Sequence, residues 1–135
     1  IFRNFPPKEL LLNDIENNQL YVYENETGIH AVFALIFGDD PTYSVIENGS
    51  WISFKPYATI HRVASDRTIK GITKEIISFS ETKINHLRID TYIDNHIMRH
   101  ILQKNGFSER GTIYISDGTP RIAYEKVNYN DITKD

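Results

Sequence analysis

Residues 57–77 read YATIHRVASDRTIKGITKEII, and this stretch decides the fold. Residues 57–64 alternate in character and are rich in β-branched side chains, which is typical of a half-buried strand. The apolar residues that follow recur at helical spacing, namely Ile69, Ile72, Ile76 and Phe79. The period therefore changes from two to about 3.6 between residues 65 and 70, which predicts a strand, a polar turn and a helix.

The polar turn between this strand and this helix is a candidate anion site. The first backbone N–H groups of a helix have no partner within the helix, and the helix dipole favours negative charge in front of them. A phosphate or pyrophosphate is the expected guest. Lys70 adds a cation, and Gly71 has no side chain to keep a ligand from the backbone. The alternative is an ordinary amphipathic helix whose N-terminus is capped by Ser65 or Asp66 of a polar loop.

The composition is typical of one soluble globular domain. Of the 135 residues, 40% are hydrophobic and 24% are charged, enough for a single core. The net charge of -3 argues against a nucleic-acid partner, which normally meets a basic face. No apolar run approaches the length of a membrane helix. The absence of cysteine excludes disulfides and thiolate sites, and we expect a cytoplasmic protein without a membrane partner.

The remaining sequence predicts further helices and strands of a mixed α/β domain over residues 1–126, with a polar tail at 127–135. Residues 38–54 have turn residues and no sustained period, and segments of this kind in compact domains are often functional. The other predicted elements are a helix at 8–17, a hairpin of strands at 20–24 and 29–37, a strand at 86–91, a helix at 94–104, and a hairpin of strands at 111–115 and 121–126.

The chain resembles the GCN5-related N-acetyltransferase (GNAT) family, whose acetyl-CoA turn reads Arg/Gln-x-x-Gly-x-Gly/Ala. Alignment on Gly71 places Thr68 at the Arg/Gln position and Thr73 at the last small residue, so both depart from the motif. Arg67 lies one position early and supplies a charge. The stronger match is downstream, in residues 87–107, which contain LRIDT, then Asn-x-x-Met, then Leu-x-Lys-Asn-Gly-Phe. The resemblance is to a bacterial subgroup and covers about residues 9–126.

The resemblance implies an acyl-CoA N-acyltransferase fold, in which a central twisted mixed sheet is splayed at the cofactor site and flanked by helices. The first strand of that fold is expected to be missing. The implied activity is transfer of acetyl from acetyl-CoA directly to a primary amine of a small molecule or peptide. The alternative is a catalytically degenerate acyl-CoA sensor or partner-binding module, which Thr68, Thr73 and Leu102 favour. The exposed hairpins also allow a homodimer.

The cofactor contacts implied by the resemblance lie at the end of the 57–64 strand, in the turn and on the helix at 94–104. They are Val63, Ala64, Arg67, Thr68, Lys70, Gly71, Ile72, Thr73, Asn95, Met98 and Lys104. For Asn95, a plain helix-start asparagine is an equal reading. For Lys104, a role as an ordinary solvated lysine is an equal alternative.

Strand alternation is expected to place Tyr57, Thr59, His61 and Val63 on one face. His61 is our first choice for a base or proton relay, because imidazole exchanges protons near neutral pH. A buried histidine with a hydrogen bond in the core is the alternative. Tyr57 stands where the family often has an acidic base.

The tyrosine acid that the family often carries is replaced here by Leu102, which cannot donate a proton. Tyr114 and Tyr124 on the last hairpin are candidate replacements, although strand tyrosines more often serve packing.

An acidic and aromatic wall for the amine acceptor is predicted from Tyr43 and Trp51, together with Asp39 and Asp40, although solvated turn aspartates are the alternative. Asp90 completes the predicted substrate residues. His96 and His100 have the spacing of a zinc helix. Because Ile97 replaces the glutamate of His-Glu-x-x-His, we expect no metal.

Overall fold

A computed structural model of the chain describes residues 1–4 and 19–128. The predicted helix at 8–17 lies outside the described residues, as does nearly all of the predicted tail. The described elements are β1 (Phe2–Asn4), β2 (Leu20–Asn25), β3 (Gly28–Phe37), the 3₁₀ helix η3 (Pro41–Tyr43), β4 (Ala58–Ser65), α1 (Ile72–Glu81), β5 (His86–Thr91), α2 (His96–Lys104), β6 (Ser108–Tyr114) and β7 (Pro120–Val127). No helix among these residues is long and apolar enough to span a bilayer.

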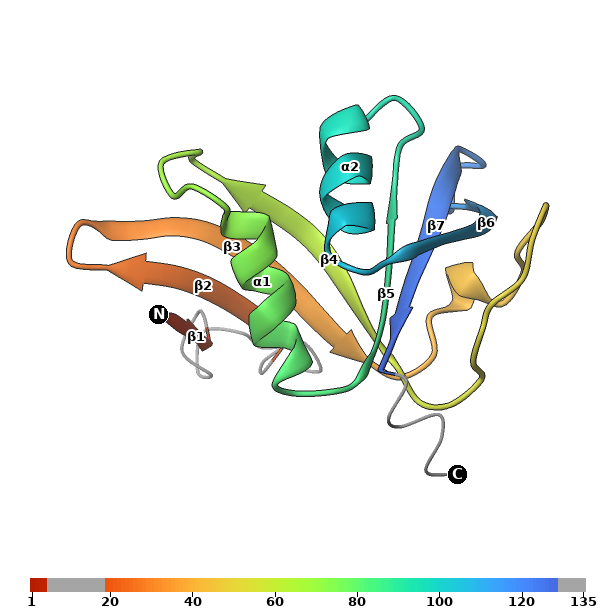
Figure 1. Cartoon of the computed structure of the whole chain (residues 1–135), viewed down its shortest axis with the longest axis horizontal. Coiled ribbons are helices and arrows are strands. Elements are labelled where there is room, and N and C mark those ends of the chain that lie inside the picture. The colour runs from red at the N-terminus through yellow and green to blue at the C-terminus, as the bar shows by residue number, and fades with distance from the viewer. Residues whose placement is uncertain (5–18, 129–135) are drawn as a thin grey trace.

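The strands form one mixed sheet in the order β1-β2-β3-β4-β5-β7-β6 (Figure 1). All neighbouring strands are antiparallel except β4 and β5, which are parallel. The parallel pairing is short, because only Ala58 with Leu87 and Thr59 with Arg88 are partners. Beyond these pairs β4 and β5 separate, and Figure 1 shows the two strands diverging. The predicted mixed α/β fold with a splayed sheet is confirmed.

Each face of the sheet has its own apolar core. The first core joins α1 and α2 to the sheet through residues such as Ile76, Leu102 and Tyr124. The second core consists of Tyr43, Trp51, Tyr57, Ile113 and Ala123. Ala123 alternates with Tyr124 along β7, so the two cores lie on opposite faces. Residues 38–57, here called the excursion and yellow in Figure 1, therefore cover the face opposite the helices.

The sheet has an edge strand that the sequence did not predict. Residues Phe2–Asn4 form β1 and pair antiparallel with β2, so the described sheet has a short strand ahead of β2. A strand of three residues is too short to show a period. Its position is set by tertiary packing, because the Phe2 ring contacts those of Tyr23, Phe33 and Phe79.

A β-bulge in β4 overturns the predicted alternation of this strand. Val32 pairs with Ala64 and Ala34 pairs with His61, so β4 carries one residue more than β3 between these pairs. Arg62 occupies the bulge with a φ of 58°. Val63 consequently packs against the first core, whereas His61 contacts the excursion on the opposite face. The prediction that His61 and Val63 share a face was wrong, because a bulge absorbs one residue of the period.

Candidate active site

A cavity of about 430 Å³, here called the central cavity, opens where β4 and β5 separate. Ile60 and Ile89 line it from the first core, while Ile115 lines it from the side of the second core. The central cavity therefore reaches both faces of the sheet. Its other lining residues include His61, Val63, Asp90, Asn95, Met98 and Arg121.

His61, which lines this cavity, forms a polar pair with Asp40. His61 Nε2 lies 2.9 Å from Asp40 Oδ2, and the two side chains are 28% and 17% exposed. Asp40 is the N-cap of η3 and accepts a hydrogen bond from the backbone N–H of Thr42 at 2.9 Å. The backbone N–H of Asp40 donates to the Tyr57 hydroxyl at 2.8 Å. Tyr57, a predicted catalytic residue, thus holds Asp40 in place.

The hydrogen bond from His61 lowers the pKa of Asp40 to about 2, and the bonds from Thr42 act in the same direction, against burial, which raises it. Asp40 is therefore a carboxylate at neutral pH. A carboxylate can only accept, so the proton of the shared bond belongs to His61 Nε2. In the neutral imidazole this leaves the lone pair on Nδ1, and His61 can take up a proton there.

Asp40 is the member of this pair that the sequence did not identify in its role. It was predicted to belong to a substrate wall, whereas it contacts His61 across 21 positions of sequence. The available signal was local, because an Asp followed by Pro at 40–41 is typical of a helical N-cap. Nothing local shows which strand a cap of this kind will face.

Asp90, which lines the central cavity, joins Tyr43 of the second core to Arg121, another lining residue. Its Oδ2 accepts a hydrogen bond from the Tyr43 hydroxyl at 2.6 Å, and its Oδ1 accepts one from Arg121 Nη1 at 3.0 Å. Burial first, and then the charge of Asp90, raise the pKa of Tyr43 well above its ordinary value, so this hydroxyl stays a donor. The Arg121 guanidinium lies 3.8 Å from the centre of the Tyr92 ring.

The predicted substrate residues Trp51 and Tyr43 are buried in the second core, with 7% and 2% of their surface exposed. Trp51 Nε1 donates to the backbone carbonyl of Tyr43 at 3.0 Å. The Arg88 guanidinium is placed between two aromatic rings, 3.9 Å from the centre of Trp51 and 4.0 Å from that of Tyr57. These aromatic side chains and Asp39 line a separate hollow of about 320 Å³ rather than the central cavity.

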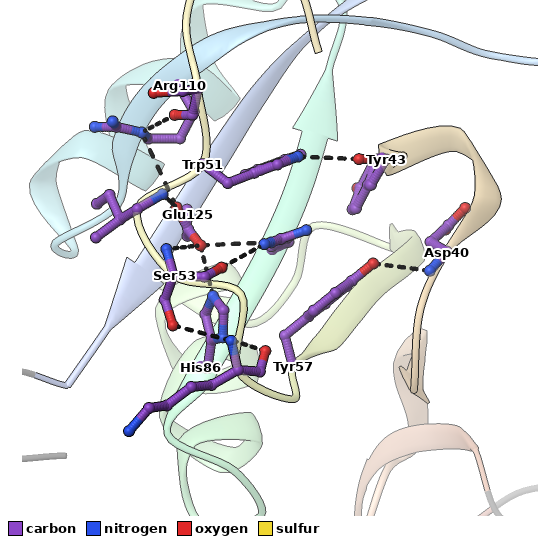
Figure 2. A network of polar contacts seen from close by, with 12 residues as sticks. Asp40, Tyr43, Trp51, Ser53, Tyr57, His86, Arg110 and Glu125 are labelled. Atoms are coloured by element: carbon purple, nitrogen blue, oxygen red, sulfur yellow. Dashed lines mark hydrogen bonds and ion pairs between the residues drawn. The ribbon is translucent and has the colours of Figure 1, made fainter. Parts of the chain in front are cut away.

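Glu125 anchors the excursion to the sheet (Figure 2). Its side chain is fully buried and accepts hydrogen bonds from the backbone N–H of Ile52 and from His86 Nε2, both at 2.6 Å. Arg88 Nε lies 3.4 Å away, and Arg88 also donates to the carbonyl of Ser53 at 2.7 Å. The segment that carries Asp40 is thus held by a buried polar network.

A second cavity of about 490 Å³, here called the turn cavity, lies at the start of α1. Its lining includes five of the predicted cofactor residues, which are Arg67, Gly71, Ile72, Thr73 and Lys104. Gly71 is the N-cap of α1, with a φ of 71° and no side-chain cap. A Cβ built on Gly71 meets nothing within 4 Å, so the space in front of the helix is open.

The alternative in which Ser65 or Asp66 caps the helix does not hold. The Asp66 carboxylate instead accepts from the backbone N–H of Thr68 at 3.0 Å, within the turn itself. The Thr68 hydroxyl also contacts Asp66 and lies 3.0 Å from His30 Nδ1. The helix begins later because Gly71, in the left-handed region, separates this turn from the first residue of α1.

The structure brings most predicted cofactor residues to one of the two cavities and leaves three outside. Val63, Asn95 and Met98 line the central cavity, and Asn95 also caps α2 by accepting from the backbone N–H of Met98 at 3.2 Å. The residues that line neither cavity are Ala64, Thr68 and Lys70. Because β4 and α2 contribute to both cavities, the two cavities lie next to each other.

The tyrosines proposed as acids do not line these cavities. Tyr114 is 43% exposed, and its hydroxyl donates to Glu47 at 3.0 Å, which raises its pKa. Tyr124 is fully buried and accepts from Arg99 Nε at 3.0 Å. Within residues 1–4 and 19–128, no group of three or more His, Asp or Glu side chains is placed to hold a metal ion.

Comparison with known proteins identifies the fold. No protein-family model matches the sequence, and no curated protein matches it. Among solved structures, a GNAT-family acetyltransferase from Streptococcus agalactiae 2603 is similar with a TM-score of 0.76 and 27% identity, over 92% of this chain and 73% of that one. Another from Listeria monocytogenes 4b F2365 has a TM-score of 0.61 and 17% identity, over 82% and 65%.

A third similar structure is the NatB acetyltransferase complex bound to CoA and MES, with a TM-score of 0.65 and 12% identity, over 94% of this chain and 98% of that one. At this identity the likeness shows the fold alone. The protein has the GNAT acetyltransferase fold, and many of its structural neighbours are bacterial acetyltransferases of the GNAT family. The predicted resemblance is confirmed, and these neighbours support acyl transfer as the general class of reaction.

Proposed function

We propose that this protein transfers an acetyl group from acetyl-CoA directly to a primary amine. The observation that carries the proposal is the central cavity, which reaches both faces of the sheet and is lined by His61, the partner of Asp40. A cavity that reaches both faces would let an acyl donor and an amine approach each other from opposite sides of the sheet. No covalent intermediate on the protein is needed.

The turn cavity fits the pyrophosphate of an acyl-CoA. The first N–H groups of α1 face it without a side-chain cap, and such groups bind phosphate well. Arg67, Lys74 and Lys104 line the same cavity and supply positive charge. Because Gly71 has no side chain, phosphate oxygens have room to approach the backbone there.

The separated part of β4 fits the amide-containing arm of the cofactor. Among the described residues, the pairing of β4 with β5 ends at Thr59, so the edge of β4 beyond it offers a place where an extended chain can bind. Val63 and Met98 line the apolar side of this gap. Bound acetyl-CoA would supply a thioester carbonyl carbon within the central cavity.

His61 would act as the proton acceptor. An alkylamine has a pKa of about 10.4 and is protonated near neutral pH, so it must lose a proton before it attacks. His61 Nδ1 accepts this proton, and the carboxylate of Asp40 stabilises the resulting imidazolium through Nε2. The attack forms the C–N bond and breaks the C–S bond. The second proton lost from nitrogen balances the charge of the leaving thiolate.

The second candidate function is an acyl-CoA sensor without transferase activity. Leu102 stands where the resemblance places a tyrosine acid, and it is fully buried in the first core. Thr73 lines the turn cavity with a larger side chain than the motif requires. These two residues favour a domain that retains the cofactor site and has lost the chemistry.

Two measurements in sequence test the proposal. Acetyl-CoA is first titrated into the protein in a calorimeter, and the release of thiol from acetyl-CoA is then followed with a panel of primary amines. Binding together with amine-dependent thiol release supports the transferase. Binding without release from any amine favours the sensor, and no heat at millimolar acetyl-CoA would exclude both.

A further inference from the structure

We infer that the amine acceptor carries a carboxylate group and that Arg121 binds it, which makes a small amino acid the expected substrate class. The inference rests on the proposed acetyl transfer. It specifies which amine enters the central cavity, and it assigns to Arg121 the role of a specificity-determining residue.

Arg121 is held in a fixed orientation with unused donors. Its Nη1 donates to Asp90, and its guanidinium plane is held by the Tyr92 ring. Neither Nε nor Nη2 has a hydrogen-bond partner among the described residues. These two nitrogens form the edge of the guanidinium that binds a planar carboxylate through two parallel hydrogen bonds. A buried N–H without a hydrogen-bond partner, such as that of Nε, is unfavourable. A ligand oxygen that accepts from it would therefore be bound favourably.

Two carboxylates are already engaged, namely Asp90, which lines the central cavity, and Asp40, which contacts the lining residue His61. Asp90 accepts from both Tyr43 and Arg121, and Asp40 accepts from His61 and Thr42. No carboxylate lining the cavity among the described residues is therefore left to bind a second ammonium group of a polyamine. The donors of Arg121 favour an acceptor with a negative charge instead.

His61 and Arg121 lie on the same side of the sheet. Arg121 precedes Ile122, which packs in the first core, so alternation along β7 directs Arg121 to the opposite face. His61 contacts Asp40 of the excursion on that face. Both residues line the one cavity of about 430 Å³. An amine near His61 and a carboxylate at Arg121 therefore belong to one small molecule.

The test compares each amino acid with its own carboxamide as acceptor, using alanine, leucine and phenylalanine. Each pair has nearly the same size, and the amide has the less basic amine, so faster turnover of the acid cannot come from easier loss of a proton. We expect kcat/KM for the acid to exceed that for the amide by about 10- to 100-fold. The difference should lie mainly in KM.

Arg121→Lys retains the charge and removes the two-donor edge. It should lower kcat/KM for the acids by about 10-fold or more. The value of kcat/KM for the amides should change by less than about twofold. Tyr92→Leu removes the ring that orients Arg121, so it should also lower kcat/KM for the acids. Arg3→Lys, at an exposed ion pair with Glu24 on the sheet edge, is the matched control and should change neither.

Equal turnover of acids and amides by the unaltered protein would overturn the inference and leave the proposed acetyl transfer intact. If acetyl-CoA binds but no thiol is released, calorimetric titration of the same pairs decides. Preferential binding of the acids that is lost in Arg121→Lys supports the inference, and equal or absent binding overturns it. Failure of acetyl-CoA to bind would overturn the proposed function and the inference together.

Discussion

Nε2 of His61 lies 2.9 Å from Oδ2 of Asp40, which joins a central strand to a segment 21 positions earlier in the chain. His61 directly precedes the bulge at Arg62, and Asp40 begins the short helix η3. The bulge keeps His61 on the face of the excursion while Val63 turns toward the helices. One irregularity of β4 therefore places the proposed proton acceptor on one face and the proposed cofactor site on the other.

Replacement of His61 should affect turnover rather than cofactor binding. We expect His61→Gln to lower kcat for acetyl transfer by about 100-fold or more, because general base catalysis contributes about that much. The dissociation constant for acetyl-CoA, measured by calorimetry, should change less than about twofold, because the cation-lined turn cavity is untouched. His100→Gln, an exposed position on α2, is the control. Unchanged turnover in His61→Gln would show that another group accepts the proton.

The pH dependence of stability should report on Asp40. Its pKa falls from 3.8 to about 2 on folding, so it stabilises the fold at pH values above 3.8 and loses this effect as the pH falls toward 2. Asp40→Asn should therefore lower the free energy of unfolding by about 1 to 2 kcal/mol at pH 6, and by less near pH 2. Urea unfolding at both pH values measures this.

Asp66 provides an internal control for that experiment. Thr68 and then His30 lower its pKa to about 2 as well, and it titrates equally in the parent protein and in Asp40→Asn. Its contribution therefore cancels in the difference between the two proteins. A difference between them that does not depend on pH would mean that the ionised form of Asp40 has no special stabilising role.

Gly71 and Gly118 form a matched pair for testing the cofactor site. Both have a positive φ, of 71° and 87°, and a Cβ at either meets nothing within 4 Å. Gly71→Ala and Gly118→Ala should each lower the free energy of unfolding by about 1 to 2 kcal/mol through backbone strain. Only Gly71→Ala places a methyl group at the turn cavity, and it should weaken acetyl-CoA binding by about tenfold. If the two variants bound acetyl-CoA with equal affinity, the pyrophosphate would not bind at this turn.

The sequence predicted those parts of the fold in which local pattern and tertiary structure agree. Residues 57–77 changed period as a strand, turn and helix should, and β4 and α1 lie there. Gly71 of the turn and Lys104, both among the predicted cofactor residues, line one cavity. In these places the side chains that define the pattern are also the ones that pack.

The parts that failed depend on contacts across the fold. A positive φ at Arg62 has no sequence signature, because arginine has no preference for the left-handed region. The excursion shows no period, since Trp51 and Tyr57 are ordered by their contact with Arg88 rather than by a regular element. The role of Asp40 follows from that ordering, and no local pattern predicts it.

Glu125 should control the site from a distance, because it anchors the excursion without touching the central cavity. Glu125→Ala leaves Arg88 and His86 buried without their counter-charge, so we expect a loss of about 3 to 5 kcal/mol of stability in urea unfolding. Glu109→Ala, which removes an exposed ion pair with Arg99, should cost less than about 1 kcal/mol. In the folded fraction of Glu125→Ala, a loosened excursion should also separate Asp40 from His61 and lower kcat. Destabilisation with unchanged kcat would show that η3 keeps its place without this anchor.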